Sequence, residues 1–179
     1  MKRSHIILIG GWWSSVIPYF MSWAWKLHAR LVAHYKSRKD VKIWVVSSDG
    51  GREKPAIAAV LKDAKNGVLG QVAIGGHSNG GGETDLASQL FYAAGIKIQY
   101  AFTIDRTLGY TGAFIYGSVS YFDEFWAGLR KTKFHSSFTG TKKFWDIDKI
   151  MGKDINHTPS ASLPFVQDKL FTEITTRIK

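Results

Sequence analysis

The sequence predicts an α/β fold: a three-layer sandwich in which helices cover both faces of a mostly parallel central sheet of about six to seven strands. Short apolar runs alternate with amphipathic segments along the first hundred residues. Three successive β-α units imply parallel strands joined by right-handed crossovers. With 179 residues the chain has the size of one domain, and we expect a single domain over residues 1–179.

The spacing of apolar residues predicts the first elements. Residues 5–9 form a continuous apolar run that ends in glycine, which is typical of a strand buried on both faces. Apolar side chains recur every three or four positions over residues 19–36, as in an amphipathic helix. A second strand is expected over residues 41–48, and a second helix over 57–64 has Pro55 in its first turn.

The third β-α unit contains a glycine-rich turn. A strand over residues 71–75 leads into this turn, and the helix after it carries Leu86 and Leu90 and ends at Gly95. A fourth strand is predicted over residues 97–104. The carboxyl ends of these strands are where functional groups gather in such sheets.

The chain after the fourth strand is aromatic and less regular. A strand is expected over residues 113–121, and the segments that flank Thr139 and Gly140 suggest a hairpin. The last element is an amphipathic helix that begins near Pro164. Its apolar face consists of Val166, Leu170, Ile174 and Ile178.

Composition excludes several classes of protein. The chain has no cysteine, so it has no disulfides and no thiolate metal sites. Residues 12–27 are apolar but shorter than a spanning helix and contain Pro18, so we expect no transmembrane segment. The start of the chain lacks a small-residue cleavage site, which favours a cytoplasmic location. The net charge of +10 favours weak contact with anionic surfaces, without any motif for specific nucleic-acid binding.

The motif that points to chemistry is Gly76–Gly80, which matches G-x-S-x-G with Ser78 at its centre. In that motif the serine occupies a strained strand-to-helix turn, and the glycines leave room for it. The alternative is a turn that only reverses the chain or cradles a phosphate. The segment lacks the glycine and lysine spacing of a P-loop and that of a dinucleotide-binding turn.

A serine hydroxyl needs a histidine to take its proton and a carboxylate to orient that histidine. Asp105 directly follows a predicted strand, so it should emerge on the same sheet edge as Ser78. Glu83 and Asp85 lie on or beside the next helix, and we expect them to point away.

The candidate base is His157, which lies in the loop before the last helix. His135 is predicted within a strand, and His77 is the variable position of the motif itself. Both are therefore weaker candidates than His157.

The order of Ser78, Asp105 and His157 resembles that of the α/β-hydrolase superfamily, and the chain looks like its compact, capless lipase and esterase branch. The resemblance implies oxyanion donors at Gly11 or Trp12, after the first strand, and at Asn79, after the nucleophile. The chain departs from the family pattern because no histidine stands directly before the Gly10-Gly11 pair, so the H-G-G form of the oxyanion loop is absent.

These observations predict a serine hydrolase that cleaves carboxylic esters of a small-molecule or lipid-like acyl substrate through an acyl-enzyme on Ser78. We expect no cofactor and no metal. Thioester hydrolysis, amide hydrolysis and acyl transfer use the same three residues and stay open.

A non-catalytic basic binding module is the alternative, because the net charge would favour an anionic polymer or membrane surface. Its candidate contacts are basic residues that we otherwise expect on a solvated hairpin face. They are Arg130, Lys131, Lys133, Lys142 and Lys143.

Overall fold

A computed structural model describes residues 1–11, 21–106, 114–115, 119–127, 137–138 and 141–179. The strands are β1 (Arg3–Gly10), β2 (Val41–Ser47), β3 (Leu69–His77), β4 (Tyr100–Ile104), β5 (Phe114–Ile115), β6 (Tyr121–Trp126), β7 (Ser137–Phe138) and β8 (Thr141–Asp146). The helices are α1 (Ser22–His34), the short 3-10 helix η2 (Asp49–Gly51), α2 (Lys54–Lys65), α3 (Asn79–Ala93), α4 (Ile147–Met151), α5 (His157–Ser160) and α6 (Pro164–Arg177).

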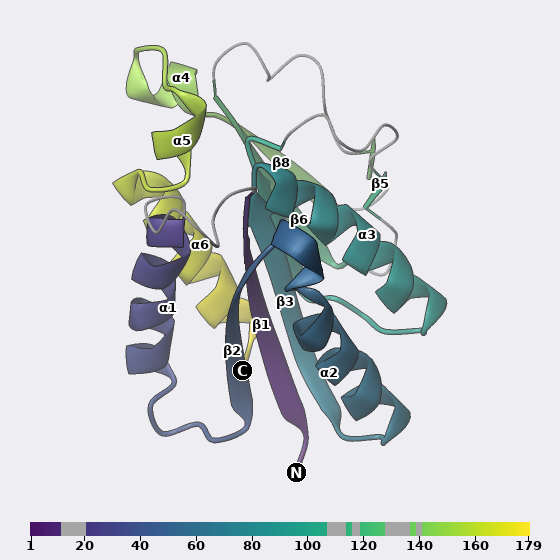
Figure 1. Cartoon of the computed structure of the whole chain (residues 1–179). Helices are drawn as coiled ribbons and strands as arrows, with labels where there is room; N and C mark the ends of the chain where they lie inside the picture. Colours follow the sequence, from purple (N-terminus) through teal and green to yellow (C-terminus); the bar gives the residue numbers. More distant parts are fainter. Residues whose placement is uncertain (12–20, 107–113, 116–118, 128–136, 139–140) are drawn as a thin grey trace.

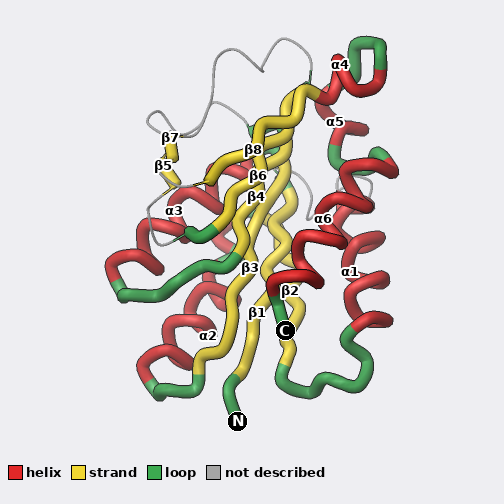
Figure 2. Tube along the Cα trace, turned by 180° about the vertical axis from the view of Figure 1, so that it is seen from behind, coloured by secondary structure: helices red, strands yellow, loops and turns green. Residues whose placement is uncertain are grey.

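Six strands form one sheet in the order β2-β1-β3-β4-β6-β8, and every neighbouring pair is parallel. Helices α1 and α6 cover one face, and α2 and α3 cover the other (Figures 1 and 2). The prediction of a three-layer α/β sandwich with a parallel sheet is therefore confirmed.

Strand β1 contributes to a separate apolar core on each face, because its side chains alternate between the two. Ile6 and Leu8 pack against α1 and α6 in one core, whereas Ile7 and Ile9 pack against α2 and α3 in the other. All four side chains are fully buried. This explains why the first strand reads as an unbroken apolar run.

Two expectations for the second half of the chain were wrong. Residues 114–115 form only β5, and the strand that extends the main sheet is β6, which starts at Tyr121. The segments that flank residues 139–140 do not pair as a hairpin: β7 pairs with β5, and β8 joins β6 in parallel. Apolar and polar residues alternate in the same way in the strands of a hairpin and in strands that join different sheets, so this alternation cannot distinguish the two arrangements.

The leucines that mark the third helix in the sequence do not face the sheet. Leu86 and Leu90 of α3 are 38% and 51% exposed. The face against the sheet carries Ala87 and Phe91, together with polar side chains such as Asp85. Small residues suit this helix because it packs closely on the strands.

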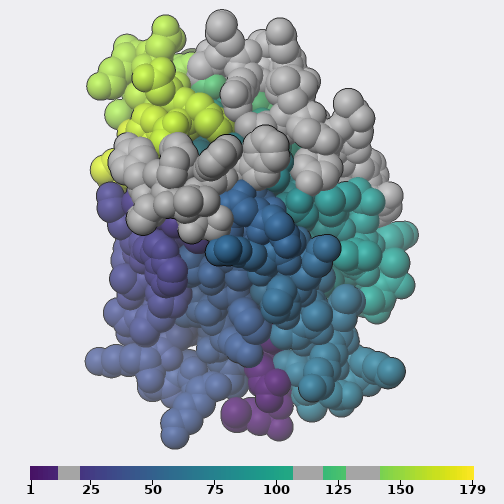
Figure 3. Space-filling view, in the orientation of Figure 1, coloured from purple at the N-terminus to yellow at the C-terminus, as the bar shows by residue number. Residues whose placement is uncertain are grey.

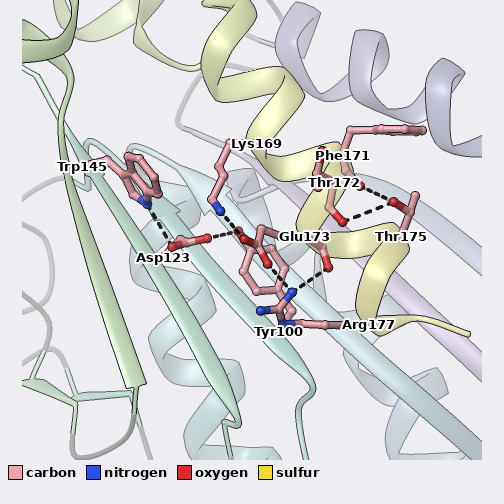
Figure 4. A network of polar contacts seen from close by, with 9 residues as sticks. All are labelled: Tyr100, Asp123, Trp145, Lys169, Phe171, Thr172, Glu173, Thr175 and Arg177. Atoms are coloured by element: carbon pink, nitrogen blue, oxygen red, sulfur yellow. Dashed lines mark hydrogen bonds and ion pairs between the residues drawn. The ribbon is translucent and has the colours of Figure 1, made fainter.

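A polar network lies between the sheet and α6 (Figure 4). Asp123, which has no exposed surface, accepts hydrogen bonds from the Tyr100 hydroxyl at 2.8 Å and from Trp145 Nε1 at 2.9 Å. Glu173 of α6 forms ion pairs with Lys169 and Arg177 on its own helix. Both oxygens of the Asp123 carboxylate thus accept a hydrogen bond, which a buried charged group needs.

The carboxyl ends of the strands and the segment that contains α4 and α5 lie at the same end of the molecule, and the N-terminus lies at the other (Figures 1 and 3). None of the helices within the described ranges combines the length and the apolar character needed to cross a membrane.

Candidate active site

The candidate site lies where the strand order of the sheet reverses. From β1 the chain adds β2 on one side and β3 on the other, which makes the crevice between β1 and β3 a topological switch point. Gly11 follows β1 and Ser78 follows β3, both at the carboxyl edge. Parallel sheets bind ligands at such a crevice.

Ser78 has a strained backbone. Its φ of 58° and ψ of −125° lie in a region that non-glycine residues rarely adopt, and such a residue costs about 1–3 kcal/mol. The strain is held by two backbone hydrogen bonds: the Ser78 N–H donates to Ile104 at 2.9 Å, and its carbonyl accepts from Gly81 at 3.0 Å. This is the strand-to-helix turn that the G-x-S-x-G motif predicts.

The glycines on either side of Ser78 are needed for close backbone approach. A Cβ on Gly76 would lie 2.3 Å from the Gly80 carbonyl oxygen, and a Cβ on Gly80 would lie 2.3 Å from the Ile9 carbonyl oxygen. Because the obstacles are backbone atoms, no side-chain movement could make room. The start of α3 can therefore approach β1 and β3 only with glycine at both positions.

Asp105 and His157 are in hydrogen-bond contact. Asp105 Oδ2 lies 2.5 Å from His157 Nδ1. The Asp105 side chain has no exposed surface, whereas that of His157 is 27% exposed. Asp105 itself has a φ of 43°, and its N–H donates to the Phe125 carbonyl at 2.7 Å. A buried carboxylate thus faces one nitrogen of a partly accessible imidazole.

This contact fixes which nitrogen of His157 carries the hydrogen. An ionised carboxylate only accepts hydrogen bonds, so Nδ1–H donates to Asp105 and the neutral ring keeps its lone pair on Nε2. That tautomer is the one a general base needs when it takes a proton from a serine hydroxyl.

His77 links the turn at Ser78 to His157. It immediately precedes Ser78, and its ring stacks on the His157 ring with centroids 4.7 Å apart and planes 27° apart. The backbone of Ser78 is in turn bonded to Ile104, the residue before Asp105. The three residues of the candidate triad (Ser78, Asp105 and His157) are therefore joined through their chain neighbours.

Asp85 does not point away, contrary to the sequence expectation. It is buried and forms an ion pair with Arg106, the residue after Asp105; both side chains are 2% exposed. Burial raises the pKa of Asp85 to about 7, against the lowering effect of Arg106. The pair ties the Asp105 loop to the helix that follows Ser78.

A second buried ion pair lies close to the first. Lys142, expected on a solvated face, is 23% exposed and pairs with Glu124 of β6, which has no exposed surface. The charges of Glu124 and Lys142 both act on the pKa of Asp85. Lys142 thus pairs with a buried carboxylate and does not lie on a fully solvated face.

The residues expected to supply oxyanion donors are only partly described. A Cβ on Gly11 would lie 2.8 Å from Ser78 Cβ and 3.2 Å from its Oγ, so the Gly11 backbone is adjacent to the serine. Asn79 is the first residue of α3, where N–H groups have no intrahelical acceptor. Trp12 lies outside the described residues, as do His135, Arg130, Lys131 and Lys133.

The sequence reasoning missed Arg106 and the role of Asp85, and it set His77 aside. A basic residue close to the end of a buried strand, as Arg106 is two residues after the end of β4, is the signal that could have drawn attention to the ion pair. Among the residues that the structure describes, no group of three or more His, Asp or Glu side chains could hold a metal ion.

Comparisons of the chain with models of protein families, with curated proteins and with solved structures found no match.

Proposed function

We propose that this protein is a serine hydrolase of the esterase or lipase type that forms an acyl-enzyme on Ser78. The observation that carries the proposal is the buried Asp105 carboxylate hydrogen-bonded to His157 at the sheet edge where Ser78 occupies its strained turn. A structural role for any one of these residues would not require all three to share this edge.

In the proposed reaction His157 Nε2 takes the proton of the Ser78 hydroxyl while Oγ attacks the ester carbonyl carbon. Collapse of the tetrahedral intermediate breaks the bond to the alkoxy group, which leaves as an alcohol with the proton from His157. Water then attacks the acyl-enzyme with His157 again as base, releasing the acid and restoring Ser78. Asp105 keeps the ring in its tautomer and stabilises the imidazolium in both halves.

The negative charge that develops on the carbonyl oxygen needs donors that are already in place. The Asn79 N–H at the start of α3 suits this role, and the Gly11 position beside Ser78 supports a second donor from the loop after β1. Removing one such donor typically lowers kcat by about 10²–10³.

The decisive test is active-site labelling with a fluorophosphonate probe, followed by mass spectrometry of the labelled peptide. We expect wild-type protein to be labelled at Ser78 and Ser78→Ala to be unlabelled. Ser47→Ala is the matched control, since Ser47 ends β2, which lies on the other side of β1 from β3, at the same sheet edge, and its hydroxyl bonds to Asp49. A panel of p-nitrophenyl esters of increasing chain length then measures turnover and acyl preference.

Absence of labelling in folded wild-type protein, or labelling that persists in Ser78→Ala, would overturn the proposal. If there is no turnover, retention on anionic liposomes or DNA that falls steeply with salt would instead favour a basic binding module. The net charge of +10 is the observation that suggests this alternative.

A further inference from the structure

We infer that His77 is a positioning residue for His157: it fixes the backbone and the ring plane of the proposed base, and does so from the turn that carries the nucleophile. This inference rests on the proposed function. His77 therefore acts through His157 and does not itself exchange protons with the substrate.

The first contact is a hydrogen bond to the main chain of His157. His77 Nε2 lies 3.0 Å from the His157 carbonyl oxygen. A carbonyl oxygen only accepts, so Nε2 carries the hydrogen and donates it. The same oxygen accepts from the Ser160 hydroxyl at 2.7 Å. Two donors from different elements, β3 and α5, thus hold one backbone group of the base.

The second contact is the ring stack. His77 is 4% exposed, and its ring lies almost parallel to that of His157, with centroids 4.7 Å apart. On its own side His77 meets Trp23 of α1 edge-on, at 6.5 Å between centroids. Trp23 is 2% exposed and belongs to the apolar core, so the core supports His77, which supports His157.

These contacts complement the bond to Asp105. The carboxylate fixes Nδ1 of His157, but one hydrogen bond leaves the ring free to tilt about it. The stack restricts the tilt, and the carbonyl contact fixes the chain from which the ring extends. His157 needs this support because α5 is a single turn whose first residue it is. An active-site group displaced by about 1 Å loses about 10²-fold in rate.

The two contacts can be separated by substitution. His77→Gln keeps a donor near the position of Nε2 but removes the ring, His77→Phe keeps a stacking ring but removes the donor, and His77→Ala removes both. His5→Gln is the matched control: His5 is 1% exposed, stacks on Trp44 and bonds to Asp63 at the opposite end of the sheet.

The experiment measures fluorophosphonate labelling at increasing probe concentration, which separates the maximal labelling rate from the concentration for half-saturation. We expect His77→Ala to lower the maximal rate about 10²-fold with the half-saturating concentration unchanged, and the Gln and Phe variants to recover part of the loss. His5→Gln should label at the wild-type rate even if its thermal stability falls.

A double-mutant cycle with Ser160→Ala tests whether both donors act through one carbonyl. Because they share an acceptor, the losses in labelling rate of His77→Phe and Ser160→Ala should be non-additive. A low-field NMR resonance of the Nδ1–H between His157 and Asp105, assigned by its loss in Asp105→Asn, should be broadened in His77→Ala and unchanged in His5→Gln.

If the wild-type protein is labelled and all three His77 variants are labelled at the same rate as the wild type, this inference is overturned. The proposed function then stays intact. A fall in thermal stability alone, with rate and NMR resonance unchanged, would also overturn it. Absence of labelling in the wild-type protein would instead overturn the proposed function.

Discussion

Asp105 and His157 stand 52 residues apart in the chain, and Oδ2 of the carboxylate lies 2.5 Å from Nδ1 of the imidazole. The carboxylate is buried on the sheet side, so the hydrogen bond presents the other ring nitrogen away from it. The orientation of the proposed base thus depends on a contact that forms only when the whole sheet edge is assembled.

Asp105→Asn should abolish most of the proposed hydrolase activity while leaving the fold intact. The amide can donate to Nδ1, which places the hydrogen on Nε2 and removes the base. We expect the rate of fluorophosphonate labelling to fall by about 10⁴. Asp63→Asn is the control, because Asp63 bonds to His5 at the opposite end of the sheet. Equal labelling rates in the two variants would contradict this role for Asp105.

Gly11→Ala should impair labelling more than it impairs folding. Its methyl group would lie 2.8 Å from Ser78 Cβ and 3.2 Å from Oγ, so the Ser78 side chain must shift. We expect a labelling rate lower by about 10². Gly70→Ala introduces comparable crowding against Ser4 and the Arg3 backbone, far from the site. It should lose stability in urea unfolding and keep the wild-type labelling rate; the reverse pattern would refute the prediction.

Asp85→Asn should change how stability depends on pH. In the unfolded chain the carboxyl has a pKa near 4, and in the folded protein burial raises the pKa to about 7. Between these values the folded state binds more protons than the unfolded state. The stability from this group is therefore full below pH 4 and is lost as pH rises through 7, by at most about 1.4 kcal/mol per pH unit.

Urea unfolding at half-unit intervals from pH 4 to 7 measures this slope. Asp85→Asn should flatten it, whereas Asp168→Asn should not, since Asp168 is 68% exposed in its ion pair with Arg30. A slope in Asp85→Asn equal to that of the wild type would show that the carboxyl does not titrate in this range.

Tyr100→Phe should destabilise the protein without changing the labelling rate. The substitution removes the hydrogen bond to Asp123 Oδ2 and leaves that buried oxygen without its donor, at a cost of about 1–3 kcal/mol. Tyr92→Phe is the control because Tyr92 is 54% exposed on α3. Its free energy of unfolding should stay within about 0.5 kcal/mol of the wild type.

Much of the fold could be predicted from the sequence, because the first four strands are short apolar runs separated by amphipathic helices. Strand β1 was expected over residues 5–9 and spans 3–10. Prediction failed for the strands after residue 105, which belong alternately to two separate sheets, whereas the last helix begins at Pro164 as expected. Which partner such a strand takes depends on tertiary packing, and its own residue pattern does not encode it.

The candidate triad could be proposed from chain order and from the position of each residue after a strand or before a helix. The supporting residues could not. The role inferred for His77 depends on its contact with His157, which is 80 residues away in the chain. The burial of Asp85 likewise depends on its ion pair with Arg106, which is 21 residues away. Leu86 and Leu90 are the apolar residues that mark this helix in the sequence, yet they are exposed, because the close packing of α3 on the strands selects small side chains.

The pairing of α1 with α6 has a consequence for the chain during synthesis. The hydroxyl of Tyr35, just after α1, donates to the carbonyl of Ile178 at 2.8 Å, across 143 residues. Leu27 and Leu31 of α1 share their core with Leu170 and Ile174 of α6. Until residues 164–178 have been synthesised, the part of this core that α6 covers stays exposed. Nascent chains that still lack this segment are therefore open to aggregation and to chaperone binding.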